Sequence, residues 1–118
     1  MLGLAHKAGT DDIRGSPAIE LYKRLAAAGA RVSAFDPQAM ANARGAYPEL
    51  VFGRDPYDTA VSVDAVLILT EWDEFRVLDW QRMRDTMARP LILDGRNLLS
   101  PTSMKSLGFE YHSVGRPD

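Results

Sequence analysis

The sequence predicts an α/β protein: a Rossmann-like three-layer domain with a mostly parallel sheet of about five or six strands. Short apolar runs alternate with helical patterns, as in a parallel sheet that helices cover on both faces. The run AVLIL at 65–69 is apolar throughout and fits a central strand. Several helical patterns start with Ser-Pro or Asp-Pro, which is typical of a capped first turn. The 118 residues have the length of one domain, 1–118.

The first elements along the chain are a strand at 2–4 and a helix at 17–28. Ser16 precedes this helix as its expected cap, Pro17 fits the first turn, and Gly29 suits the position just after the end. Spacings of three and four residues predict a buried stripe on the helix, formed by Ile19, Tyr22, Leu25 and Ala26.

Weaker patterns fill the middle of the chain. A strand at 31–35 stops at Asp36, which a proline follows, and Asp55 repeats this cap-and-proline signal. The expected elements of this part are the strand at 31–35, a weak helix at 38–44, a strand at 50–52 and a short helix from 56 to about 61.

The second half has clearer signals. Asp79 caps a helix, Ser100 with its following proline opens another, and Gly108 ends it. After the strand at 65–69, the expected elements are a helix from 79 to about 87, a strand at 91–93, a helix at 101–107 and a strand at 109–112. The tail from Gly115 is expected to fray.

Composition excludes several classes of function. The formal net charge of −2, with Lys and Arg scattered along the chain, gives no basis for nucleic-acid binding. No apolar run approaches the roughly 20 residues that cross a bilayer, and no leader pattern is present, so we expect a cytoplasmic protein without membrane contact. Without cysteine, disulfides and thiolate chemistry are excluded, and His6 and His112 lack companions at metal-site spacing.

Three loops are candidates for ligand binding, because ligands in such sheets bind at the carboxyl ends of the strands. They are 5–14, 70–75 and 94–97. Lys7 offers a point charge in the first loop, and Arg96 offers a two-pronged grip on phosphate or ribose hydroxyls in the third. The alternatives are a solvated surface lysine and an arginine that pairs with Asp94 or Asp11.

The other polar and aromatic loop residues have structural interpretations. Of Asp11 and Asp12, one is expected to cap backbone N–H groups and the other to pair with Arg14. The aromatic residues of TEWDEF, Trp72 and Phe75, suit packing under their loop better than stacking on a base. His6 either contacts a ligand or fills space beside the strand.

Catalytic motifs are missing from the chain. The first turn is not GxGxxG, no phosphate-binding P-loop is present, and no Ser/His/Asp set has a nucleophile elbow. The residues therefore describe a binding module, and we assign no catalytic residue and no metal site.

The motifs together resemble a known family. Segments GLAHKAGTDDIRGSP, DPYDTA, VDAVLILTEWDEF, LDGRNLL and GFEY occur in this order and cover essentially the whole chain. They resemble the C-terminal UDP-binding domain of the UDP-glucose/GDP-mannose dehydrogenase family, and TEW.EF looks most like the UDP-glucose 6-dehydrogenase branch.

The resemblance implies an NAD-dependent oxidoreductase that converts UDP-glucose to UDP-glucuronate through a cysteine-bound intermediate. Its N-terminal NAD-binding domain and central helical region, which carries the cysteine, are not in this sequence, so the isolated chain is expected to be inactive. The implied partners are a UDP-sugar, these missing domains and, as family members form dimers or larger assemblies, further copies of the chain.

The resemblance also assigns roles to four residues. The family's Phe-Lys pair falls on His6 and Lys7 and contacts the UDP-sugar. The arginine of DGR falls on Arg96 and binds the UDP part, while the arginine of TDD.R falls on Arg14 and reaches the NAD. Because His6 replaces phenylalanine, the resemblance does not carry over an apolar side-chain contact at this position, although it still allows a backbone contact.

The alternative is a stand-alone, non-catalytic regulatory or oligomerisation module of Rossmann-like fold. A phosphoacceptor receiver domain has a similar length and layer order. It needs an aspartate after its third strand and a lysine after its fifth, where this chain has Gly53 and Arg96.

Overall fold

The fold is described by a computed structural model, which covers residues 1–114; the expected frayed tail from Gly115 lies outside the described residues. Two parallel sheets form the centre of the molecule. In the first, β1 (Ser33–Ala34) pairs with β2 (Val51–Phe52). In the second, the order is β3 (Val66–Ile68), β4 (Leu91–Asp94) and β5 (Glu110–Ser113). The expected α/β class with parallel strands is confirmed.

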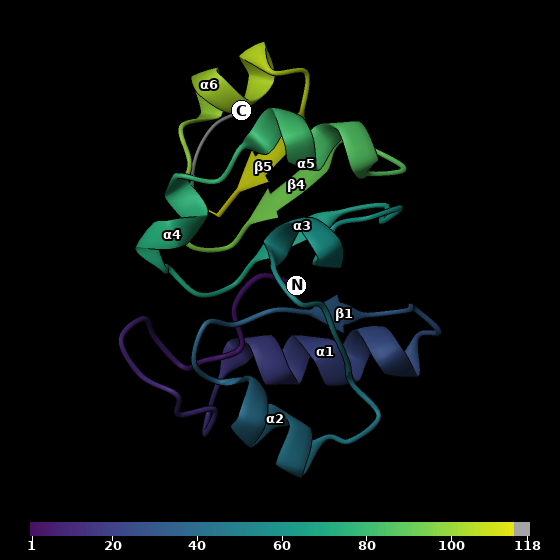
Figure 1. Cartoon of the computed structure of the whole chain (residues 1–118), viewed down its shortest axis with the longest axis vertical. Helices are drawn as coiled ribbons and strands as arrows, with labels where there is room; N and C mark the ends of the chain where they lie inside the picture. The colour runs from purple at the N-terminus through teal and green to yellow at the C-terminus, as the bar shows by residue number, and fades with distance from the viewer. Residues whose placement is uncertain (115–118) are drawn as a thin grey trace.

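The N-terminal segment joins the two sheets. Leu2 forms isolated parallel bridges to Phe35, just after β1, and to Ile68 of β3. Figure 1 shows this segment between the half of the molecule that contains α1 and β1 and the half that contains β4 and β5. The expected strand at 2–4 is therefore reduced to a bridge, because Gly3 has a φ of +103° and leaves the extended conformation. The described residues form five strands.

Six helices connect and cover the strands in residues 1–114. Asp55, Asp79 and Ser100 accept hydrogen bonds from the N–H three residues ahead, so these three predicted caps are confirmed. The helices are α1 (Pro17–Ala27), α2 (Met40–Ala46), α3 (Pro56–Thr59), α4 (Asp73–Arg76), α5 (Trp80–Thr86) and α6 (Pro101–Ser106).

Helix α1 differs from the prediction in two respects. Ser16 makes no side-chain cap; its hydroxyl donates instead to the Leu4 carbonyl at 2.8 Å. Ile19 and Tyr22 are buried as expected, but Leu25 is only partly buried and Ala26 is exposed. The last turn of α1 projects past the two-residue strand β1, so the stripe ends early (Figure 1).

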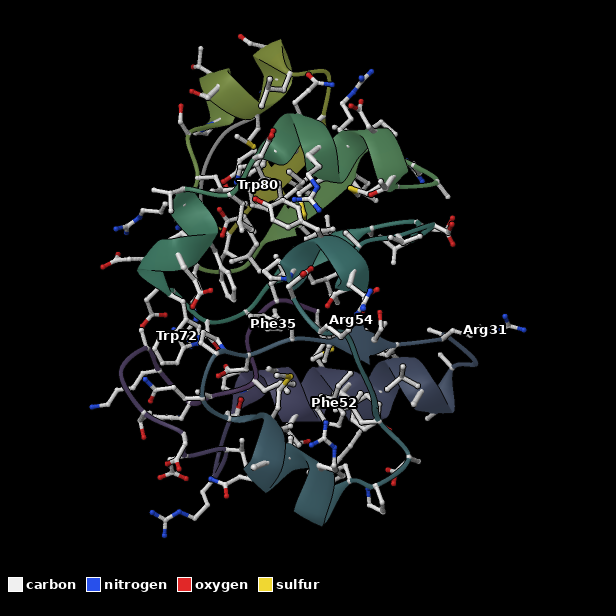
Figure 2. All side chains as sticks on the ribbon, in the orientation of Figure 1. Arg31, Phe35, Phe52, Arg54, Trp72 and Trp80 are labelled. Atoms are coloured by element: carbon white, nitrogen blue, oxygen red, sulfur yellow. The ribbon has the colours of Figure 1, made fainter. Side chains whose placement is uncertain are left out.

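The predicted loop at 70–75 contains an unexpected helical turn, α4. Its Phe75 is fully buried, and the Trp72 indole N–H donates to the Asp36 carboxylate at 3.0 Å beside the first loop (Figure 2). Packing under the loop is thus confirmed for both aromatic residues. These two anchors hold the chain in a tight turn, a tertiary effect that local propensity does not report.

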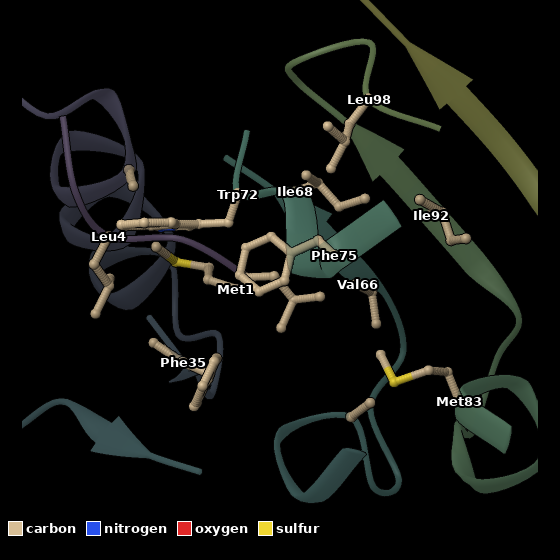
Figure 3. Close-up of a cluster of buried hydrophobic side chains, with 14 of the residues drawn as sticks. Met1, Leu4, Phe35, Val66, Ile68, Trp72, Phe75, Met83, Ile92 and Leu98 are labelled. Atoms are coloured by element: carbon tan, nitrogen blue, oxygen red, sulfur yellow. The ribbon is translucent and has the colours of Figure 1, made fainter. Parts of the chain in front are cut away.

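The hydrophobic core extends across both sheets. Figure 3 shows Met1, Phe35, Phe75 and Ile92 within one cluster, and the rings of Phe35 and Phe75 meet edge to face at 6.4 Å between centroids. Burial of this kind stabilises the fold by about 25 cal/mol per Å² of apolar surface. No helix in residues 1–114 is long and apolar enough to cross a membrane.

Candidate binding site at the carboxyl edge of the sheet

The loops predicted to carry a ligand meet at the carboxyl edge of the sheet. The guanidinium of Arg96 in the third loop donates to the Leu69 carbonyl at 2.9 Å and to the His6 carbonyl at 3.1 Å. The hydroxyl of Thr70, in the second loop, donates to the Ala5 carbonyl at 2.9 Å. Loops far apart in the sequence are thereby joined directly.

The backbone of residues 4–6, just before Lys7, is fixed by hydrogen bonds at every polar group. Each N–H and each carbonyl of these three residues has a hydrogen-bond partner within the chain. The three N–H groups donate to Asp36, Asp36 and the Asp12 carbonyl, and the three carbonyls accept from Ser16, Thr70 and Arg96. Because every polar group has its partner, this segment is a rigid base for the exposed side chains that follow.

Asp36 is the first of two buried aspartates that organise this edge. Its side chain is fully buried and accepts from the N–H groups of Leu4 and Ala5 and from the indole of Trp72. Its other oxygen accepts from two N–H groups at the approach to α2, those of Gln38 and Ala39. Sequence reasoning treated Asp36 only as a strand terminator; its position directly after a strand was the available signal.

Asp94 is the second organising aspartate. Its exposed fraction is 1%, and it accepts from the N–H groups of Arg96, Leu98 and Leu99 and from the Tyr111 hydroxyl. An ion pair between the Arg96 guanidinium and Asp94 was one sequence interpretation. It is wrong, because Asp94 instead binds the Arg96 backbone and sets the shape of the loop.

The Arg96 side chain pairs with a different acid. Its Nε lies 3.2 Å from a carboxylate oxygen of Glu71, which follows Thr70 at the end of β3. The Nε–H of Arg96 points at the Leu69 carbonyl. This Glu71 oxygen therefore interacts with the guanidinium through charge attraction and not through a hydrogen bond. Two of the five guanidinium N–H groups donate to carbonyls, which leaves three for other acceptors.

Lys7 and His6 project from the fixed segment with exposed side chains. Within residues 1–114, no acidic side chain forms an ion pair with Lys7. The His6 backbone is used internally, since its N–H donates to the Asp12 carbonyl and its carbonyl accepts from Arg96. Arg96 is thus bonded to the carbonyl of His6, the residue that directly precedes Lys7 in the chain.

Arg14 lies further along the first loop and forms a two-pronged pair with Asp12. Its Nε and Nη2 each donate to Asp12 oxygens at 3.0 Å, and its side chain is 90% exposed. These hydrogen bonds lower the pKa of the Asp12 carboxyl to about 2 and raise the pKa of Arg14. The predicted pairing of one aspartate with Arg14 is confirmed, and that same residue, Asp12, also accepts from the Arg14 backbone N–H. The side chain of Arg14 has no contact with Lys7 or Arg96.

The second aspartate of that pair acts through its backbone. The Asp11 carbonyl accepts from the Asn42 amide of α2 at 2.8 Å, which ties the tip of the loop to the helix. Among residues 1–114, no cluster of three or more His, Cys, Asp or Glu side chains is arranged to hold a metal ion.

Comparisons with known proteins identify the family of the chain. The sequence profile of the UDP-glucose/GDP-mannose dehydrogenase family, UDP binding domain, matches residues 1–101. The chain is 48% identical to the UDP-glucose 6-dehydrogenase of Rhizobium meliloti over 118 residues, which is all of this chain and 27% of that protein. The chain therefore spans about a quarter of the length of this relative.

Solved structures give the same result. A UDP-glucose dehydrogenase from Pyrobaculum islandicum matches with a TM-score of 0.70 and 35% identity, over 82% of this chain and 21% of that one. A UDP-D-ManNAc dehydrogenase from Pyrococcus horikoshii matches with a TM-score of 0.78 and 28% identity, over 98% and 24%. The fold, the loop motifs and the profile agree: this chain belongs to the UDP-glucose/GDP-mannose dehydrogenase family and corresponds to its UDP binding domain.

Proposed function

We propose that residues 1–118 form the UDP-sugar-binding domain of an NAD-dependent UDP-glucose 6-dehydrogenase, which oxidises UDP-glucose to UDP-glucuronate. The support is the family membership and the identity of 48% to a protein of that name. The chain spans only 27% of that relative, and it contains neither a cysteine nor the NAD fingerprint. We therefore assign the chemistry, and most of the NAD contact, to parts of the enzyme outside these residues.

One observation carries the binding proposal: at the carboxyl edge, Arg96 is bonded to the carbonyl of His6, and the next residue is the exposed Lys7. Lys7 supplies a mobile point charge, and Arg96 keeps three N–H groups in a planar fork that suits phosphate oxygens. The diphosphate of UDP is doubly anionic or more at neutral pH, so it needs such a pair. Its place is between the Lys7 ammonium and the free side of the Arg96 guanidinium.

His6 and Arg14 have secondary roles in this proposal. The N–H of His6 is engaged by Asp12, so a ligand contact at His6 uses its exposed imidazole or the second lone pair of its carbonyl. Arg14 points into solvent on a loop that Asp12 and Asn42 hold in place. From there it reaches an NAD that another part of the enzyme binds.

The test compares UDP with uridine as ligands of the 118-residue chain. Amide NMR shifts measure the binding. We expect UDP to bind weakly and uridine, which lacks the phosphates, to bind more weakly still. Lys7→Ala and Arg96→Lys should each lower the affinity for UDP about tenfold, equivalent to about 1.4 kcal/mol, with little effect on uridine. Lysine at 96 keeps the charge and loses the fork.

Arg31→Ala is the matched control, since Arg31 is an exposed arginine that precedes β1 at the opposite edge. It should leave the affinity for UDP unchanged. An unchanged affinity for UDP in both Lys7→Ala and Arg96→Lys would refute the site. If the original chain does not bind UDP at all, the result would favour the stand-alone module.

A further inference from the structure

We propose that Thr70 is a positioning residue for UDP binding: its buried hydroxyl fixes the Ala5 peptide and so places Lys7 against Arg96. This inference rests on the proposed function, and it gives a role to a residue outside the four predicted site residues. Thr70 is the residue after Leu69 in the AVLIL strand segment, and its side chain is fully buried.

The contact between Thr70 and the first loop is short and enforced by packing. The Thr70 hydroxyl donates to the Ala5 carbonyl at 2.9 Å. A Cβ atom built on Gly3 would lie 2.5 Å from the Cβ, N and Oγ1 atoms of Thr70, so only glycine at position 3 permits this approach. The φ of +103° at Gly3 adds a second reason for glycine there.

The carbonyl that Thr70 holds is followed directly by the carbonyl that Arg96 holds. Ala5 accepts from Thr70 and His6 accepts from Arg96, so the two hydrogen bonds fix successive peptide groups immediately before Lys7. Thr70 therefore acts on both cations of the site. It orients the backbone that carries Lys7, and it presents the His6 carbonyl that anchors the Arg96 guanidinium.

Removal of the hydroxyl isolates this role. Thr70→Val keeps the shape of the side chain but leaves the buried Ala5 carbonyl without its donor, so that peptide keeps only the hydrogen bond from the His6 N–H to the Asp12 carbonyl. Thr70→Ser restores the donor with a smaller side chain. Because the buried Thr70 side chain does not contact UDP in this proposal, its substitution should change the affinity for UDP only through the position of loop 5–14.

The chain offers a matched control in Thr59, the last residue of α3. Its side chain is also buried, and its hydroxyl donates to the Asp55 carbonyl at 2.7 Å. It is also pressed against a glycine, Gly53, so Thr59→Val removes the same hydroxyl at a site outside the three loops, where the Asp55 carbonyl keeps the Thr59 N–H as a donor.

The experiment measures UDP affinity by amide NMR titration of the 118-residue chain and its variants. Thr70→Val should raise the Kd for UDP about tenfold, whereas Thr70→Ser and Thr59→Val should stay within about twofold of the original chain. In a Lys7→Ala background, Thr70→Val should raise the Kd by clearly less than tenfold, because the part of its effect that acts through Lys7 is already lost and only the part through Arg96 remains. An unchanged Kd in Thr70→Val, or a full additional tenfold loss in that background, overturns the proposal.

A second readout needs no ligand. Hydrogen exchange of the Ala5 and His6 amides should accelerate in Thr70→Val relative to those of Ile92 and Leu93 in β4, and Thr59→Val should leave the ratio unchanged. If the original chain shows no response to UDP, the proposed function fails. Unaltered exchange at His6 refutes the positioning role in either case. Should Thr70→Val not fold, Thr70→Ala makes the same test.

Discussion

The two edges of the sheet are built on opposite principles. At the carboxyl edge, two buried aspartates, Asp36 and Asp94, gather backbone N–H groups from the loops, and Arg96 joins those loops across the strand ends. At the amino edge lies a groove of about 790 Å³, lined mainly by apolar residues that include Met1 and Val61. The hollow beside loop 10–14 has a smaller volume, about 540 Å³.

This difference is the reason we expect the ligand at the carboxyl edge and not in the larger hollow. The charged side chains in the lining of the groove are Arg31 and Asp64, and Arg31 points away from the molecule (Figure 2). At the carboxyl edge, buried aspartates hold the backbone of the loops in place. Burial of such polar groups lowers the stability of the fold unless each group has a hydrogen-bond partner. We expect an anionic ligand to bind where hydrogen bonds preorganise the Arg96 guanidinium, rather than where the hollow has the largest volume.

The largest expected effect tests the buried polar groups of the carboxyl edge. Asp94→Ala removes the acceptor of three backbone N–H groups and of the Tyr111 hydroxyl, so it should destabilise the chain by at least about 4 kcal/mol. Asp94→Asn keeps one oxygen and should cost about 1–3 kcal/mol. Urea unfolding measures both.

Val61→Thr in the exposed part of the groove is the control for this prediction. The Val61 side chain is 53% exposed, so the free energy of unfolding should change by no more than about 0.5 kcal/mol. Equal losses at the two edges would erase the distinction between them.

When the 118-residue chain is made as a separate polypeptide, its first residue adds a buried polar group to the amino edge: the α-amino group of Met1, which donates to the Ser33 carbonyl at 2.7 Å. Burial lowers its pKa from the ordinary 8.0 to about 5. Between these values the amine is neutral in the folded chain and protonated in the unfolded one, so the free energy of unfolding should rise from pH 5 to pH 8. Three pKa units set an upper limit of about 4 kcal/mol.

Urea midpoints at pH 5, 6, 7 and 8 check this, with the N-acetylated chain as control. Acetylation removes the titrating amine, and the rise should shrink accordingly. The same pH profile for both chains would mean that another group is responsible.

Local signals explain which parts of the fold could be predicted. Asp55, Asp79 and Ser100 cap their helices as expected, because a cap depends on residues three positions apart. Ser16 has the same local signal, but its hydroxyl serves the Leu4 carbonyl of the first segment. The expected strand at 2–4 does not form for a similar reason, since the N–H groups of Leu4 and Ala5 donate to the Asp36 side chain and not to a neighbouring strand.

In the candidate site too, local signals were predictable from the sequence and contacts between distant segments were not. The sequence indicated which loops meet, because their place after parallel strands follows from topology. It could not indicate that Arg96 pairs with Glu71, or that Thr70 and Asp36 hold the backbone before Lys7, because these contacts join segments between 25 and 90 residues apart only after folding. The roles of His6, Lys7, Arg14 and Arg96 in ligand binding stay predictions.

The most direct test of the central claim is a map of amide NMR shifts over the whole chain as UDP is added. The claim that the carboxyl edge is the binding edge predicts the largest changes at 6–8 and 95–97, with none at 29–33 and 61–65. Changes gathered around the groove of the amino edge, with the loops unmoved, would contradict it.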